Sequence, residues 1–114
     1  MPRATTCKPS DTSVTAAFYA IQCETPGYFY LGATKDLSHR IKQHLGPKAP
    51  KITKKHGVKD VIYIRFFPTM YEATIFECFK ARQLRLRGFK NTYGGGYTFD
   101  QEAKDSRLDE PSFT

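Results

Sequence analysis

The sequence has no tryptophan, only three cysteines and no long apolar run. An odd number of cysteines with no CxxC pair argues against a zinc site and against a disulfide framework. No apolar stretch approaches the ~20 residues that a membrane-spanning helix needs. The opening MPRATTCKPSDTSVT lacks the apolar segment of a secretion signal. We therefore expect an intracellular protein, cytoplasmic, nuclear or of viral origin inside a host cell, with no membrane partner.

Positive charge is concentrated in the middle of the chain. The net charge is +7 and the pI is about 9.4. Between residues 35 and 90, fourteen Lys and Arg face four acidic residues, whereas residues 100–114 hold five acids and two bases. A basic body is typical of proteins that bind phosphates, so the charge distribution favours a nucleic-acid partner. A basic surface with no particular partner is the alternative.

The length of 114 residues suits one domain with its own core. Residues 1–14 are polar and rich in Thr, Ser and Pro, which predicts a flexible leader. We place the folded domain at residues 15–99 and a flexible acidic tail at residues 100–114.

The first half of the domain predicts a hairpin followed by a helix. Apolar, aromatic runs at residues 14–21 and 28–32 flank the turn sequence ETPG, which favours two antiparallel strands. Thr34 or Asp36 can cap the next helix. Its apolar stripe follows helical spacing and ends before a Gly-Pro pair; it consists of Leu37, Ile41 and Leu45.

The second half predicts a basic loop, a buried strand and a longer helix. Residues 47–59 hold five lysines and no acid, and we expect a loop that ends in a short helix. The continuous apolarity of residues 61–67 favours a central strand that is buried on both faces. A capping box of Thr69 and Glu72 opens a helix that runs to about residue 87. The fold class is therefore α+β: a small three-stranded antiparallel or mixed sheet flanked by helices, in the order β-β-α-β-α.

Two short motifs at the start of the domain resemble those of a known family. Ala17-Phe18-Tyr19 is followed by Tyr30-Leu31-Gly32, which looks like the paired strand motif of the GIY-YIG nucleases. An arginine stands eight residues after the glycine, and a histidine follows one helical turn later. A glutamate and an asparagine complete the similarity, which spans residues 16–98. The residues that carry it are Tyr19, Tyr30, Gly32, Arg40, His44, Glu77 and Asn91. The first motif departs from the family at two positions. The family motif begins with Gly where this chain has Ala17, and its middle residue differs from Phe18.

The resemblance implies catalytic roles for Tyr19, Tyr30, Arg40, His44, Glu77 and Asn91. Their chemistry suits phosphodiester hydrolysis. Glu77 supplies the oxygen ligand that Mg²⁺ prefers, and Mn²⁺ can substitute. Arg40 offers a planar fork for a phosphate, although a surface ion pair with Asp36 would also explain it. Tyr19 would activate water if neighbouring cations lower its pKa.

Alternative explanations exist for most of these residues taken singly. Tyr19 and Tyr30 could be core aromatics, and His44 could favour a helix C-terminus. Glu77 could be an exposed glutamate that pairs with Lys80 or Arg82. Basic side chains would follow the nucleic-acid backbone without reading sequence; these are Lys48, Lys51, Lys54, Lys55, Lys59, Arg82 and Arg85.

We interpret the chain as a Mg²⁺-dependent endonuclease that hydrolyses duplex or branched DNA by the one-metal mechanism of the GIY-YIG family. No DNA-reading module is recognisable, so we expect a sequence specificity that is low, that depends on DNA structure, or that comes from a partner protein. Cleavage of both strands would need a homodimer or two visits. The first alternative is a catalytically inactive nucleic-acid-binding protein on the same scaffold. The second is an adaptor that acts through the acidic tail.

Overall fold

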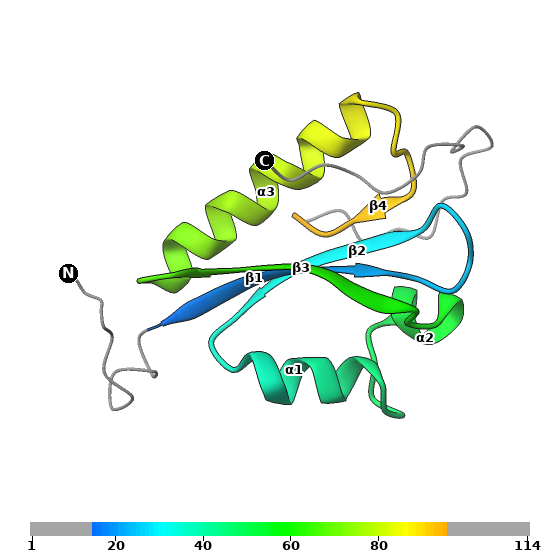
Figure 1. The fold of residues 1–114 in the computed structure, drawn as a ribbon, viewed down its shortest axis with the longest axis horizontal. Helices are drawn as coiled ribbons and strands as arrows, with labels where there is room; N and C mark the ends of the chain where they lie inside the picture. The colour runs from blue at the N-terminus through cyan, green and yellow to red at the C-terminus, as the bar shows by residue number, and fades with distance from the viewer. Residues whose placement is uncertain (1–14, 96–114) are drawn as a thin grey trace.

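The computed structural model describes residues 15–95 of the chain, and the predicted leader and tail lie outside them. Seven elements follow one another in this region (Figure 1). They are β1 (Ala16–Gln22), β2 (Phe29–Thr34), α1 (Leu37–His44), α2 (Lys51–His56), β3 (Asp60–Phe67), α3 (Met70–Leu86) and β4 (Thr92–Tyr93). No helix among the described residues is long and apolar enough to span a membrane.

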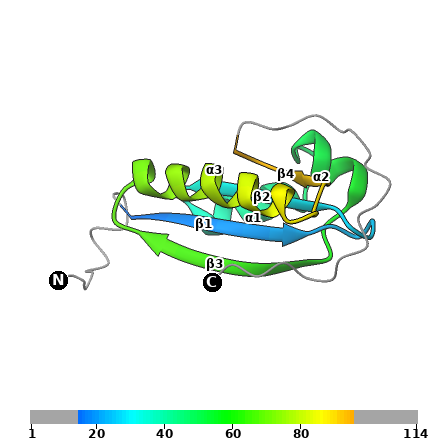
Figure 2. The same ribbon diagram turned by 90° about the horizontal axis from the view of Figure 1, so that it is seen from above.

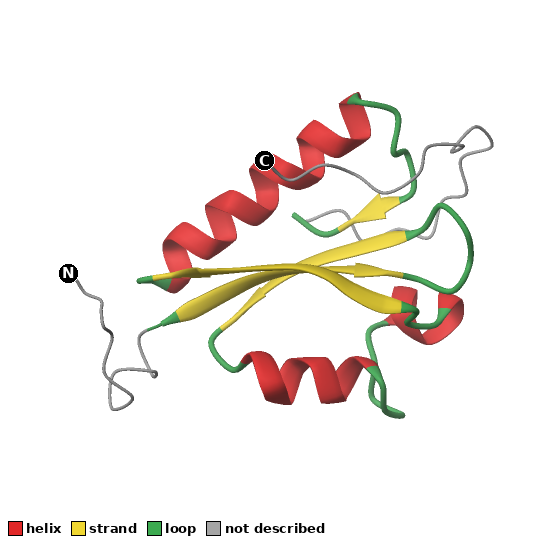
Figure 3. Cartoon of the chain, viewed as in Figure 1, coloured by secondary structure: helices red, strands yellow, loops and turns green. Residues whose placement is uncertain are grey.

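The strands form one mixed sheet in the order β3-β1-β2-β4. β1 is antiparallel to both β2 and β3, whereas the short β4 runs parallel to β2. Helix α3 lies on one face of the sheet, and α1 and α2 lie on the other (Figures 1 and 3). The predicted α+β class is confirmed, with four strands in place of three. A two-residue strand such as β4 carries too little periodicity to be predicted.

The prediction that residues 61–67 form the central strand is wrong. β3 is an edge strand, and Ile64 and Phe66 are exposed. β1 is the strand between two antiparallel neighbours and is almost entirely buried. The apolarity of β3 comes from one face that packs on α3 and from apolar side chains left exposed on the other. Hydrophobicity alone therefore could not show how many neighbouring strands β3 has.

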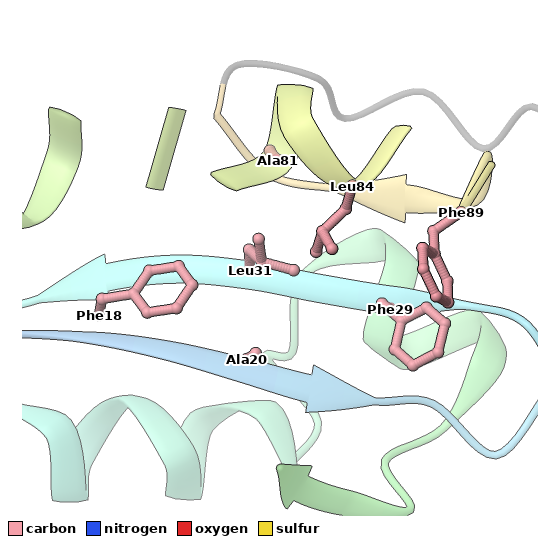
Figure 4. Close-up of a cluster of buried hydrophobic side chains, with 7 residues drawn as sticks. All are labelled: Phe18, Ala20, Phe29, Leu31, Ala81, Leu84 and Phe89. Carbon is pink, nitrogen blue, oxygen red and sulfur yellow. The ribbon is translucent and has the colours of Figure 1, made fainter. Parts of the chain in front are cut away.

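The core lies between the sheet and α3. Alternate residues of β1 and β2, among them Phe18 and Leu31, point toward Ala81 and Leu84 of the helix (Figure 4). Phe18 also meets the ring of Phe76 edge-on, with centroids 4.9 Å apart. Phe18, one of the two departures from the family motif, is thus a core residue. Because side chains alternate along a strand, the residues between them face α1.

Local capping explains where the two main helices begin. The carboxylate of Asp36 accepts the His39 amide at the start of α1. Thr69 accepts the Glu72 amide at the start of α3, as the predicted capping box requires. The predicted apolar stripe of α1 is only partly correct, because Leu45 is 66% exposed. The buried residue of α1 is the polar His44, the last residue of the helix.

Candidate active site

Tyr19 lies at the centre of the site, on the face of β1 that points toward α1. Its side chain is fully buried, and across the strand pair it faces Gly32 of β2. A Cβ atom at position 32 would overlap the hydroxyl end of the Tyr19 ring. The glycine of the second motif is therefore needed because the tyrosine of the first motif occupies the space where its side chain would be.

The hydroxyl of Tyr19 joins the two α1 residues that the sequence singled out. Its oxygen is 2.9 Å from Nε2 of His44 and accepts a hydrogen bond of 3.2 Å from Nε of Arg40. Arg40 also donates from Nη1 to Gln43, at 2.7 Å. The ring of Tyr30 lies against His44, with centroids 4.9 Å apart. The structure thus brings Tyr19, Tyr30, Arg40 and His44 together.

The position of α2 fixes the tautomer of His44. Thr53 of α2 donates its hydroxyl proton to the Pro50 carbonyl, so the same oxygen accepts the hydrogen bond from Nδ1–H of His44 at 2.9 Å. Nε2 therefore carries the lone pair and accepts the O–H of Tyr19. His44 is not the dipole-favoured terminal histidine of the alternative explanation, but a buried acceptor.

The expected direction of the Tyr19 pKa is wrong for this structure. Burial raises the pKa of Tyr19 to about 12, and the hydrogen bond from Arg40 offsets only part of that effect. Burial likewise raises the pKa of Tyr30. The sequence showed the nearby cation but gave no measure of burial, which is the larger effect. At neutral pH both tyrosines therefore keep their protons.

Burial, assisted by the charge of Arg40, lowers the pKa of His44 from 6.5 to about 4. The imidazole is therefore neutral at pH 7 and can accept a proton at Nε2. In the unfolded chain the same histidine would be protonated below its ordinary pKa. At a pH between the folded and the unfolded pKa of His44, the unfolded state binds one more proton than the folded state, so acidification favours unfolding.

We therefore expect the free energy of unfolding to fall as the pH drops from about 6.5 toward 4, by up to ~3 kcal/mol from His44 alone. Urea titrations at pH 7 and pH 4.5 would measure this loss. A His44→Gln variant should lose less stability between these two pH values. An equal loss in both proteins would show that other groups dominate.

Glu77 reaches the site from α3. Its Oε2 accepts the backbone amide of Gly95, just after β4. Burial raises the pKa of Glu77, and the Gly95 hydrogen bond and the charge of Arg40 oppose this rise. The charge of Glu77 in turn acts on Tyr19 and Tyr30, so the carboxylate lies within interaction range of the group. Lys80, one of the two alternative partners, donates to Gln83 instead.

The donor set fits a divalent cation that keeps most of its water ligands. Within residues 15–95 no three His, Cys, Asp or Glu side chains gather, and the carboxylate that acts on Tyr19 and Tyr30 is Glu77. Gly95 uses one carboxylate oxygen, which leaves Oε1 for a cation. Mg²⁺ is commonly held by one or two carboxylates together with water and phosphate oxygens. A half-buried carboxylate held by a single amide suits that pattern.

The other predicted residues lie around this group or apart from it. Asn91 is buried just before β4, and its carbonyl accepts the Phe29 amide. Arg85 donates to the Thr92 carbonyl at 2.8 Å, which ties α3 to β4. Arg82 is exposed on α3. The remaining basic residues are exposed in or next to α2, the helix that contacts His44 through Thr53; they are Lys48, Lys51, Lys54, Lys55 and Lys59.

Three supporting residues were missed in the sequence. Thr53 fixes the His44 tautomer, Gln43 holds Arg40, and Gly95 holds Glu77. Gln43 stands three residues after Arg40, a helical spacing that could have indicated the contact. Thr53 lies inside a lysine-rich stretch and gives no such signal.

The comparison with known families agrees with this geometry. Residues 15–90, more than half of the chain, match the model of the GIY-YIG catalytic domain. The chain therefore belongs to the GIY-YIG family, a class of nuclease domains. No curated protein and no solved structure matched the chain.

Proposed function

We propose that this protein is a divalent-metal-dependent endonuclease that hydrolyses phosphodiester bonds of DNA, with Mg²⁺ as the physiological ion and Mn²⁺ as a substitute. One observation carries the proposal: the Tyr19 oxygen lies 2.9 Å from Nε2 of His44, accepts a hydrogen bond from Arg40, and lies within range of the Glu77 carboxylate. A packing tyrosine needs no such partners. The arrangement provides a proton path next to a phosphate-binding cation and a single metal-binding carboxylate.

Proton transfer would begin at the Tyr19 oxygen. An attacking water gives a proton to that oxygen while the phenol proton moves to Nε2 of His44, so Tyr19 remains neutral overall. This path answers the problem of a pKa near 12, because Tyr19 need not ionise before the reaction. A phosphate bound to Arg40 would neutralise one of the two causes of the low His44 pKa, so substrate binding strengthens the base.

Arg40 would hold the scissile phosphate and stabilise the charge that develops on its oxygens. Gln43 orients the guanidinium through Nη1, and Tyr19 orients it through Nε. A divalent cation on Glu77 would polarise the phosphate and stabilise the departing oxygen. Tyr30, whose hydroxyl belongs to the same group, would position the phosphate. Asn91, whose side chain is buried, would position the β4 backbone.

The lysines around α2 would bind the DNA backbone on the side of the site formed by α1 and α2. We expect Lys51→Ala/Lys54→Ala to weaken DNA binding equally for unrelated sequences. The slope of log K against log salt should fall by about 2, since each phosphate contact contributes ~0.9. Fluorescence anisotropy at several salt concentrations would measure both effects. Lys90→Ala is the control, because Lys90 is an exposed lysine after α3. An equal loss of DNA affinity in this variant would mean that the α2 lysines have no special role.

The direct test is plasmid cleavage. Supercoiled plasmid should be converted to the nicked form with Mg²⁺ or Mn²⁺ and should stay supercoiled with EDTA. A single site cuts one strand, so a linear product should appear only after nicking.

The inactive nucleic-acid-binding alternative makes the opposite prediction. If the protein shifts DNA in a gel yet never cuts plasmid, branched or single-stranded DNA with either ion, the proposal of catalysis fails. The adaptor alternative depends on the acidic tail, residues 100–114, which lies outside the described residues.

A further inference from the structure

β3 forms one edge of the sheet, with β1 on its inner side (Figure 2). Among residues 15–95 no strand pairs with its outer side. An edge strand of eight residues is usually protected by lysines, prolines or bulges, because its backbone groups can pair with another chain. β3 contains no lysine or proline, and its register shift lies near its start, opposite Ala20 and Ile21. Within the described residues, the stretch from residue 64 to residue 67 therefore pairs regularly with β1 and has no strand on its outer side.

The α3-facing side of this edge is positively charged. Arg65 of β3 pairs with Phe18 of β1, so both side chains lie on the same face of the sheet. The guanidinium lies 5.1 Å from the ring centre of Phe67 and 5.0 Å from that of Phe76. On α3, Nζ of Lys80 lies 5.4 Å from the same Phe76 ring. The aromatic rings hold two cations close together.

No acid offsets these cations in the described part of the chain. Lys80 is buried, at 7% exposed, and donates to the neutral Gln83. Burial lowers its pKa, and the charges of Arg87 and Arg65 lower it further, with no carboxylate acting in the other direction. Gathering like charges at a partly buried place costs free energy that an anionic partner would recover.

The opposite face of the same edge is apolar. Ile64 is 44% exposed and Phe66 is 63% exposed. They pair across the sheet with Tyr19 and Ala17, so both point to the α1 side. A strand added next to β3 would therefore place its alternate side chains beside two different surfaces: Arg65 and Lys80 on one face, Ile64 and Phe66 on the other.

We propose that the outer edge of β3 binds an extended segment of a partner protein in which acidic and apolar residues alternate. The partner strand would extend the sheet through backbone hydrogen bonds, as in β-augmentation. A nucleic acid has no row of amides and carbonyls to pair with this edge. A second copy of residues 63–67, paired in register about Arg65, would bring two Arg65 side chains together and would add no acid.

The test uses the full-length protein, labelled with nitrogen-15, and three synthetic peptides. The first alternates Glu and Val, the second has the same composition with the Glu and Val residues in separate blocks, and the third alternates Lys and Val. We expect the first to shift the amide signals of β3 and the second to bind at least about tenfold more weakly. Equal binding of the first two would overturn the proposal, because it would show attraction by charge alone.

Two variants and one control sharpen the test. Phe66→Glu should abolish binding of the Glu-Val peptide, and Arg65→Glu should reverse the preference in favour of the Lys-Val peptide. Leu86→Glu is the control, since Leu86 is 82% exposed and is the last residue of α3 rather than a residue of β3. Circular dichroism verifies that each variant is folded. The proposal is also overturned if no peptide binds, if sedimentation shows a dimer that Phe66→Glu dissociates, or if Phe66→Glu weakens DNA binding instead.

Discussion

Glu77→Gln should lower the rate of DNA cleavage by ~10³-fold or more while DNA binding stays close to that of the wild type. The amide keeps an oxygen for the Gly95 backbone N–H, so the local structure is preserved. It lacks the negative charge that a divalent cation requires. Single-turnover cleavage of a labelled duplex would measure the rate, and anisotropy in Ca²⁺ or EDTA would measure binding.

Glu72→Gln is the matched control, because Glu72 lies on the same helix but serves the cap at Thr69. It should cleave at nearly the wild-type rate. Cleavage by Glu77→Gln at the wild-type rate would refute the assignment of Glu77 as the metal ligand. An equal loss in both variants would trace the effect to the stability of α3.

Tyr19→Phe should reduce the cleavage rate by ~10²- to 10⁴-fold, with little change in the Michaelis constant. The ring remains in its buried place beside Gly32, but the oxygen that links Arg40 to His44 is lost. Tyr63→Phe, on the neighbouring strand and the α3-facing side, should leave the rate nearly unchanged.

A double variant tests whether Tyr19 and His44 act as one proton path. If they do, Tyr19→Phe combined with His44→Gln should be little worse than either single change. Effects that multiply would indicate two independent roles, and the proposed path through Nε2 would then fail.

The sequence was sufficient for the elements whose signals are local. The two hairpin strands and the capped helices α1 and α3 follow from apolar periodicity, capping residues and turn residues. The edge position of β3 could not be predicted, because the same apolar run suits a central strand and an edge strand covered by a helix. β4 is fixed by its contact with β2 and by Arg85 rather than by its own pattern.

Several members of the candidate site were predictable from the sequence, but its supporting residues and its electrostatics were not. The motif spacing selected Tyr19, Arg40 and His44, which the fold brings into contact. Their protonation depends on burial, which single-sequence reasoning could not measure, and burial reversed the expected shift of the Tyr19 pKa. The tautomer of His44 depends on Thr53, a residue from a stretch that was predicted mainly as a basic loop.

The amide of Gly95 has a consequence for the order in which the molecule is made. The hairpin, α1, α2 and α3 are all complete before Gly95 leaves the ribosome, yet the carboxylate of Glu77 has no backbone donor until then. A growing chain would therefore assemble its sheet and its basic surface first and its full set of site contacts last. If the protein is a nuclease, the ability to cut is acquired only after Gly95 has emerged, when the preceding elements are already complete.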